Sequence, residues 1–306
     1  MVATEGMSNH ALSERLLEIA EREDSGEPKT GRRYYYLALS HGYIEPDMSD
    51  TPEGKKSRDA AYKRVTDVLG VLRKQGRLGW HMVLDLTREL IEWRTFASPR
   101  EARAYLRRIY DEDRWLGQPY FPVLVVEKDT MVPITEPMAR RWQMPFASSR
   151  GYGSLKLQHD TASLIRRRYA MIRRHAMRLR RQQEETGLLI VVYFISDHDP
   201  SGLDLQRAWD QALTSFGARF RLVRIGLTRT QVDALDNARL REGIEVKPSD
   251  SRSQTYIAEY GDRCWEVDIL PATVIEQALD AHIRSWRDER LWRRRDREIE
   301  RARALI

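Results

Sequence analysis

The chain has almost no cysteine, since Cys264 is the only one among its 306 residues. A single thiol excludes an intramolecular disulfide framework and a zinc site built on cysteines. Long apolar runs are missing as well: no stretch reaches the roughly 18 apolar residues of a membrane span, and residues 1–25 are polar and acidic rather than signal-like. We therefore expect a cytoplasmic protein that is neither secreted nor membrane-spanning.

Charge, by contrast, is abundant. Charged residues make up 32% of the chain and hydrophobic residues 41%, and 52 Lys and Arg against 46 Asp and Glu give a net charge of +6. This composition supports two modest cores, so we expect two domains, residues 1–118 and 119–306. A basic excess favours a polyanionic partner such as DNA, although many basic proteins bind no nucleic acid.

The first domain shows the pattern of three helices. An amphipathic segment covers 11–23, a second helix begins after Thr30 and ends at His41, and a third is expected to be capped by Ser57 and to end at Gln75. In this third helix most basic residues, including Lys63 and Arg64, lie outside the apolar stripe. This is the pattern of a helix that contacts DNA. The turn that follows, residues 76–80, favours a winged helix, although another small helical domain would show a similar pattern.

The second domain alternates strands and helices. Strands are expected at 122–127, 144–149, 188–196 and 220–225, and the helices between them at 135–142, 157–186 and 203–216. This order is typical of an α/β fold with a parallel Rossmann-like sheet, whose ligands bind at the carboxyl ends of the strands. The last stretch, 284–303, is rich in Arg, Asp and Glu and indicates a solvated helix without chemistry.

Acidic residues gather where these strands end. Glu127 ends one expected strand, and Asp197 and Asp199 end another. Three such carboxylates repel one another unless a hard cation lies between them, and Mg²⁺ prefers oxygen ligands of this kind. The alternative is a solvated turn at the end of a strand. For Asp204 we favour a role as a first-turn acid of its helix, and we expect His198 to point away, as a second-layer or solvent-facing residue.

Three motifs carry a family resemblance: VVEKD at 125–129, SRGY at 149–152 and DHDPSG at 197–202. They resemble the Toprim domain of topoisomerase VI A subunits, of their meiotic double-strand-break relatives, and of the short mini-A proteins of phages and plasmids. The resemblance covers 121–225 well and the N-terminal domain more loosely. It implies that Glu127, Asp197 and Asp199 hold Mg²⁺ at the scissile phosphate, and that Arg150, with its neighbour Tyr152, contacts DNA.

The segment TGRRYYY at 30–36 resembles the family motif Thr-x-Arg-x-x-Tyr-Tyr, whose second tyrosine is the nucleophile. The resemblance thus implies that Tyr36 is catalytic and that the segment, including Arg33, contacts DNA. Independently, Arg32 and Tyr36 are four residues apart and share a helix face, where the guanidinium favours the phenolate. Gly31 departs from the apolar residue usual in the motif, so Tyr35 remains an alternative nucleophile.

The resemblance implies transesterification: Tyr36 attacks double-stranded DNA to form a 5′-phosphotyrosyl break with Mg²⁺. Family members act as homodimers in which the tyrosine of one protomer meets the Toprim cleft of its partner. The sequence contains no ATP-binding motif, so either a separate ATPase B subunit supplies strand passage or the protein is a stand-alone cleavage enzyme of the mini-A kind. Two alternatives stay open: a hydrolytic Toprim nuclease without a covalent intermediate, and a non-catalytic DNA-binding protein.

Overall fold

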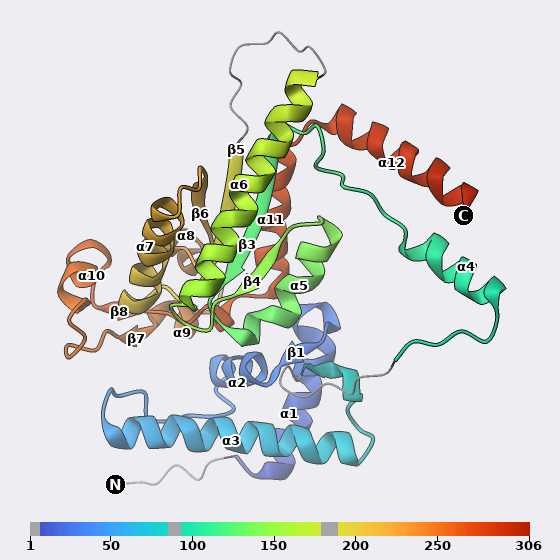
Figure 1. Cartoon of the computed structure of the whole chain (residues 1–306). Helices are drawn as coiled ribbons and strands as arrows, with labels where there is room; N and C mark the ends of the chain where they lie inside the picture. The colour runs from blue at the N-terminus through green and yellow to red at the C-terminus, as the bar shows by residue number, and fades with distance from the viewer. Residues whose placement is uncertain (1–6, 85–92, 179–188) are drawn as a thin grey trace, which may run out of the picture.

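The computed structural model describes residues 7–84, 93–178 and 189–306 (Figure 1). Two large hydrophobic cores lie in it, one built from residues 12–78 and one from residues 115–292, and a small third cluster joins Val246, Tyr256 and Cys264. Tyr36 packs against both large cores. The first core lies within the expected domain 1–118, whereas the second also takes in Trp115 from that range, and Tyr36 lies where the two cores meet.

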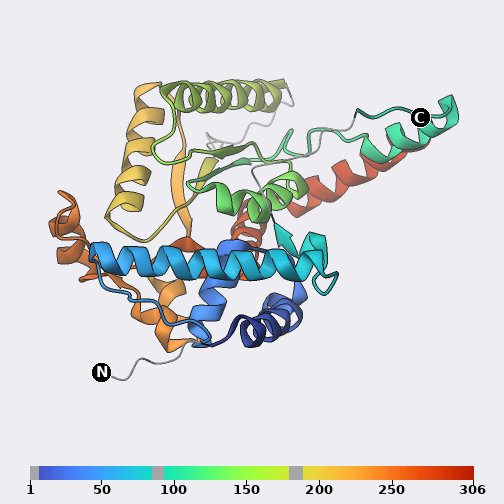
Figure 2. The same cartoon turned by 90° about the horizontal axis from the view of Figure 1, so that it is seen from below.

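The first core joins three helices, α1 (Asn9–Arg22), α2 (Gly31–Ser40) and α3 (Pro52–Lys74). The helix predicted after Thr30 is present as α2, because the Thr30 hydroxyl accepts a hydrogen bond from the Arg33 amide at 3.1 Å. α3 lies below the sheet domain in Figure 1, and it therefore crosses the front of the molecule in the view from below (Figure 2).

The start of the third helix was predicted wrongly. It is capped by Thr51, whose hydroxyl accepts from the Gly54 amide at 3.0 Å, and not by Ser57, which lies inside the helix. Thr51, Pro52 and Glu53 are an N-cap, a proline at the first helical position and an acid in the first turn. This combination is a stronger start signal than a lone serine. The corrected start adds two basic residues, Lys55 and Lys56, to the helix, which Arg58 already belonged to.

A winged helix is only partly visible. The strands β1 (Lys29–Thr30) and β2 (Val83–Leu84) pair in parallel beside the three helices. The residues that would continue a wing, 85–92, lie outside the described residues. The winged helix therefore stays a prediction, whereas its three helices are confirmed.

The second core holds a four-stranded parallel sheet in the order β4-β3-β5-β6. Its strands are β3 (Tyr120–Val126), β4 (Phe146–Ser148), β5 (Leu189–Ile195) and β6 (Arg221–Gly226). The four predicted strands and the parallel α/β class are confirmed. In the register Val126 lies beside both Ser148 and Ile195, so three strands end together.

Helices cover both faces of this sheet (Figures 1 and 2). On one face α6 (Leu155–Arg178) packs beside α7 (Pro200–Ser215), and on the other α5 (Val132–Arg141) packs beside α11 (Ala272–Trp286). The end predicted for the long helix, 179–186, lies outside the described residues. None of the described helices is long and apolar enough to cross a membrane.

Between β6 and α11 lies a lobe for which the sequence pattern made no prediction. It consists of short elements: α8 (Arg229–Asp233), α9 (Ala238–Glu242), β7 (Ile244–Glu245), α10 (Ser253–Tyr260), β8 (Arg263–Cys264) and the 3₁₀ turn η4 (Val267–Ile269). This lobe lies beside α7 at the edge of the molecule (Figure 1). It supplies two acids that the sequence analysis missed.

The expected solvated C-terminal helix is two helices. α11 ends at Trp286, and α12 (Glu289–Leu305) begins after Asp288, whose side chain accepts from the Leu291 amide. α12 is also anchored: Trp292 is buried, with its ring 4.9 Å from that of Trp115. Beside α12 lies α4 (Pro99–Ile109), a helix without a sequence prediction that has no buried residue.

Candidate functional site

The DHDPSG segment forms a tight turn between β5 and α7. Asp199 caps α7, because its Oδ1 accepts from the Gly202 amide at 2.5 Å. A side-chain carbon at Gly202 would lie only 2.2 Å from the Asp197 carbonyl oxygen, so the turn requires glycine there. This close approach holds Asp197 and Asp199 at the end of the sheet.

His198 points away from these carboxylates, as expected, but it does not face solvent. It is buried, its Nδ1 lies 2.7 Å from the Tyr256 hydroxyl, and the rings of Tyr260 and Trp265 contact it. Burial lowers its pKa to about 4. His198 therefore fastens the aspartate turn to the C-terminal lobe.

Glu127 lies beside the aspartate turn, since its Oε2 accepts from the Asp197 amide at 3.2 Å. Burial raises the pKa of Glu127 and of Asp199, and it raises that of Asp197 to about 7. Behind them lies Arg224, whose guanidinium donates to four backbone carbonyls, that of Asp197 included. The three predicted acids are thus brought together at one edge of the sheet, as expected.

The cation that this structure places among the acids is a lysine. The Lys128 ammonium lies 2.7 Å from Asp197 Oδ2 and 3.4 Å from both Glu266 Oε2 and Asp268 Oδ2. Burial lowers the pKa of Lys128, but the three carboxylates outweigh it and raise the pKa. Glu266 and Asp268 were missed by the sequence analysis. The only signal for them was the acid-x-acid spacing that they share with Asp197 and Asp199.

The donor set agrees with Mg²⁺ in its chemistry. Glu127, Asp197 and Asp199 offer carboxylate oxygens at the carboxyl ends of adjacent strands, which suits a hard cation. Within the described part of the chain, however, no three or more His, Cys, Asp or Glu side chains converge closely enough to hold a metal ion. In the arrangement shown, the Lys128 ammonium is the cation nearest to Asp197.

Helix α2, which carries Tyr36, contacts Glu266 and Asp268 from the side of the first core. The Arg32 guanidinium donates to Glu266 Oε2 (2.9 Å from Nε) and lies 3.8 Å from Asp268. The Glu266 carboxylate also acts on the Tyr36 phenol, which lies close to it. Burial and Glu266 raise the pKa of Tyr36, and Arg32 opposes them. Arg32 and Tyr36 therefore share a helix face, as their spacing predicted.

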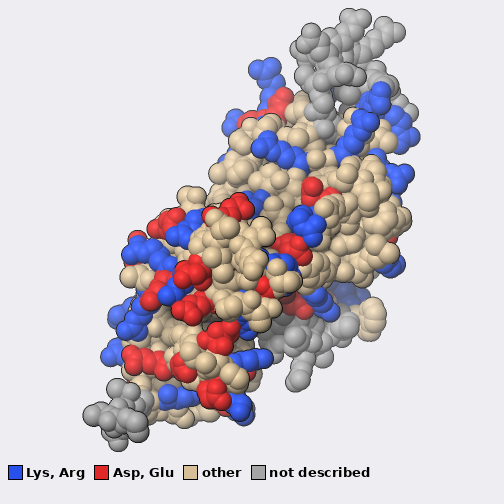
Figure 3. Space-filling view, turned by 90° about the vertical axis from the view of Figure 1, so that its left-hand side faces the viewer, with Lys and Arg blue, Asp and Glu red and all other residues tan. Residues whose placement is uncertain are grey.

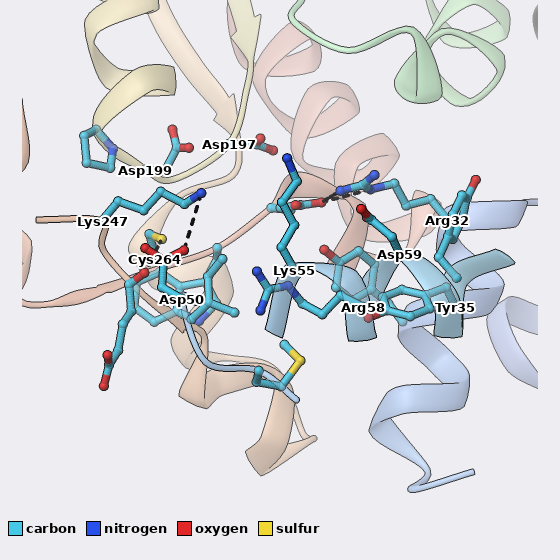
Figure 4. A pocket seen from close by; sticks show the side chains of 18 of the residues that line it. Arg32, Tyr35, Asp50, Lys55, Arg58, Asp59, Asp197, Asp199, Lys247 and Cys264 are labelled. Atoms are coloured by element: carbon cyan, nitrogen blue, oxygen red, sulfur yellow. Dashed lines mark hydrogen bonds and ion pairs between the residues drawn. The ribbon is translucent and has the colours of Figure 1, made fainter. Parts of the chain in front are cut away.

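A cavity of about 340 Å³ joins the two halves of the site (Figure 4). Arg32, Tyr35 and Tyr36 line it from α2, and Asp197 and Asp199 line it from the sheet domain. Among the further lining residues of α3 and the C-terminal lobe, Lys55, Arg58 and Lys247 are basic, whereas Asp59, Glu245 and Asp250 are acidic. The cavity therefore combines a phenol, carboxylates and three cations that could contact phosphate groups.

Tyr35 differs from Tyr36 in its surroundings. It is buried, its hydroxyl has no hydrogen-bond partner among the described residues, and its ring contacts those of Tyr36 and Tyr62 edge-on. Burial raises its pKa. Arg32, the cation that favours a phenolate, shares the helix face of Tyr36.

The residues predicted to contact DNA are scattered. Arg33 is only 7% exposed and donates to the Ile269 carbonyl at 2.6 Å, which speaks against a DNA contact. Arg64 bonds to Asn9, whereas Lys63 is exposed.

On the sheet domain, Arg150 is exposed and pairs with Asp129 at 3.0 Å. Tyr152 donates to Asp204 at 2.5 Å, so Asp204 is engaged away from the acidic cluster. On the face drawn in Figure 3, basic and acidic side chains alternate and form no continuous basic band.

Comparisons with protein-family models, with curated proteins and with solved structures find no match for this chain. Its functional interpretation therefore rests on its own residues and their geometry.

Proposed function

We propose that this protein cleaves double-stranded DNA by tyrosine transesterification, with Mg²⁺ as cofactor. The observation that carries the proposal is the shared cavity, which Tyr36 and Arg32 line from one side and Asp197 and Asp199 from the other. A nucleophile, a cation beside it and metal-binding acids are the groups that phosphoryl transfer requires.

Each residue has a role in this proposal. The Tyr36 oxygen attacks a backbone phosphorus, its proton passes to water, and the 3′ oxygen of the broken bond takes a proton from water. Arg32 stabilises the charge that develops on the phosphate. Glu127, Asp197 and Asp199 would hold Mg²⁺, which supplies Lewis-acid stabilisation of the same phosphate. Lys55 and Arg58 position the DNA backbone.

The proposal includes the partners that the resemblance implies. Two chains of a cytoplasmic homodimer would cut the two strands, and a separate ATPase subunit would be needed for strand passage. Neither partner is required for the cleavage step itself.

A hydrolytic nuclease is the second candidate, and one observation favours it. The Tyr36 phenol lies beside the Glu266 carboxylate, and its pKa lies well above the usual value, so it is protonated at neutral pH. In a nuclease, water would replace the phenol as nucleophile, and Tyr36 would contact the phosphate.

Plasmid cleavage separates these functions. Supercoiled plasmid is incubated with the protein and Mg²⁺ or EDTA, and detergent-stopped samples are run with and without proteinase digestion. Transesterification yields cut DNA that enters the gel freely only after digestion. Cut DNA that needs no digestion indicates the nuclease, and intact plasmid throughout contradicts both.

A further inference from the structure

Helix α4 lies on the side of the molecule away from the C-terminal lobe. In both ribbon views it lies beside α12 and apart from the helices that cover the sheet (Figures 1 and 2). The segment at its C-terminal end is anchored to α12, because Arg303 donates to the Tyr110 carbonyl at 2.8 Å. Arg295 of α12 pairs in addition with Glu112 at 2.7 Å. α4 is therefore held in place, although none of its own residues is buried.

The residues of α4 divide into a basic face and an apolar face. Arg100, Arg103 and Arg107 are spaced by three and four residues, so they form one row along the helix. All three are exposed. Ala102 and Tyr105, on the other side, are the only residues of α4 that are partly buried. The arginine row is thus the face that α4 presents to solvent.

No acid neutralises this row among the described residues. Glu101, the acid of α4, accepts from the Ala97 amide at 2.7 Å instead. The three acids that follow α4 pair with other arginines: Asp111 with Arg114, Glu112 with Arg295 and Asp113 with Arg168. Like charges three and four residues apart destabilise a helix, and an 11-residue helix without buried residues has little to offset this. A polyanion bound along the row would remove the repulsion.

We propose that α4 is a second DNA-contacting surface, whose arginine row binds phosphates of the duplex outside the cavity. From Arg100 to Arg107 a helix rises by about 10 Å, which matches about three steps along one DNA strand. Contacts of this kind position the duplex without reading its sequence. The inference rests on the proposed function for the choice of DNA as the polyanion.

Two other occupants fit this surface less well. A second copy of the chain would bring an identical positive row to the first and would be repelled by it. A lipid surface would have to take up the apolar face, of which Ala102 and Tyr105 are already partly covered. The unpaired charge therefore favours DNA.

Binding of uncleaved duplex tests the proposal separately from cleavage. Arg100→Gln, Arg103→Gln and Arg107→Gln are combined, and affinity for a fluorescein-labelled duplex is measured by anisotropy in EDTA at several salt concentrations. The slope of log affinity against log salt should fall by about 2 to 3, because each phosphate contact contributes about 0.9. Glutamine and arginine have similar helix propensity, so the change removes charge and leaves the helix intact.

The matched control removes the same charge from other exposed positions. Arg140, Arg293 and Arg294 each pair with an acid four residues away. Replacing these three by glutamine should change the slope by less than about 0.5, since none of them is expected to contact phosphate. An equal loss in both triple variants would show that only net charge matters and would overturn the proposal, as would an unchanged slope in the α4 variant.

A crosslink tests whether α4 touches the DNA. Arg103→Cys in a Cys264→Ser background is labelled with an azidophenacyl group and irradiated with the duplex. We expect the DNA to become attached to this position and not to the same label at Arg140→Cys. Absence of a crosslink from Arg103→Cys would overturn the proposal. So would binding to phosphatidylserine vesicles that the α4 variant loses while its affinity for DNA stays unchanged, because the partner would then be a lipid surface.

These results separate the inference from the proposed function. If the α4 variant shows the expected loss but wild-type protein does not cut plasmid, the DNA surface stands and the cleavage proposal fails. If wild-type protein cuts plasmid and the α4 variant binds duplex as wild type does, cleavage stands and the α4 surface is removed. A wild-type protein that binds no duplex would contradict both.

Discussion

Replacing Lys128 by methionine perturbs the acidic cluster most directly, because it removes the ammonium and keeps most of the aliphatic volume. At an effective dielectric constant of about 20, two charges 2.7 Å apart attract by about 6 kcal/mol, and desolvation of both offsets much of this. Lys128 and Asp197 are only 22% and 10% exposed, so screening by solvent is limited. Removing one partner of such a pair typically costs about 3 kcal/mol or more.

We therefore expect Lys128→Met to lower the free energy of unfolding by about 3 kcal/mol in metal-free buffer near neutral pH. The cost stays near this value because Asp197, whose pKa is already about 7, can take up a proton when the ammonium is gone. Urea denaturation followed by tryptophan fluorescence measures the change. Added Mg²⁺ should stabilise Lys128→Met more than wild type, since a cation that binds only the folded state restores part of the loss.

Lys156→Met is the matched control. Its ammonium pairs with Asp160 on an exposed helix face, where its side chain is 83% exposed, and the change should cost less than about 0.5 kcal/mol. The reasoning is refuted if Lys128→Met unfolds within about 0.5 kcal/mol of wild type, because the cluster would then be too well solvated to need its ammonium.

Three further outcomes are expected. Burial raises the pKa of Glu266, but Lys128 and Arg32 lower it to about 2, below the value of 4.5 in an unfolded chain. The ion pairs of Glu266 therefore stabilise the folded state above pH 4.5. This stabilisation is lost as the pH falls from 4.5 towards 2. The stability difference between wild type and Glu266→Gln should shrink over that window, as urea midpoints at several pH values will show. Asp199→Ala removes the N-cap of α7 and should lower the free energy of unfolding by about 1 kcal/mol, measured by thermal unfolding, whereas Asp199→Asn keeps the cap. Neither variant should cleave DNA. Arg58→Gln should reduce the slope of log affinity for DNA against log salt by about 1, measured by fluorescence anisotropy, and a slope unchanged from wild type would mean that Arg58 does not contact phosphate.

The sheet could be predicted because each strand shows a recognisable pattern of residues in the local sequence. β3 and β5 are runs of buried apolar residues, and each is followed by the acids that a parallel sheet brings to one edge. The parallel register, with Val126 beside Ile195, then places Glu127 near Asp197 without further information. Local pattern and topology were sufficient for this half of the site.

The rest of the site depends on long-range contacts that no local pattern encodes. β7 and β8 have two residues each, too few to show a periodicity, so the lobe that carries Glu266 was missed. The position of Lys128 among three acids, and the pair between Arg32 and Glu266, arise only when distant segments pack together. The error at the start of α3 was different, since Thr51 and Pro52 were a readable signal.

The most direct measurement of the central claim is covalent capture of end-labelled duplex DNA. A 5′-phosphotyrosyl link leaves the protein on the fragment that keeps a 3′ label, so this label should migrate with protein on a denaturing gel in the presence of Mg²⁺, and a 5′ label should not. Tyr36→Phe should abolish the adduct, and Tyr35→Phe should retain it. An adduct that persists in Tyr36→Phe would contradict the assignment of the nucleophile, and cleavage without an adduct in any of these proteins would contradict transesterification.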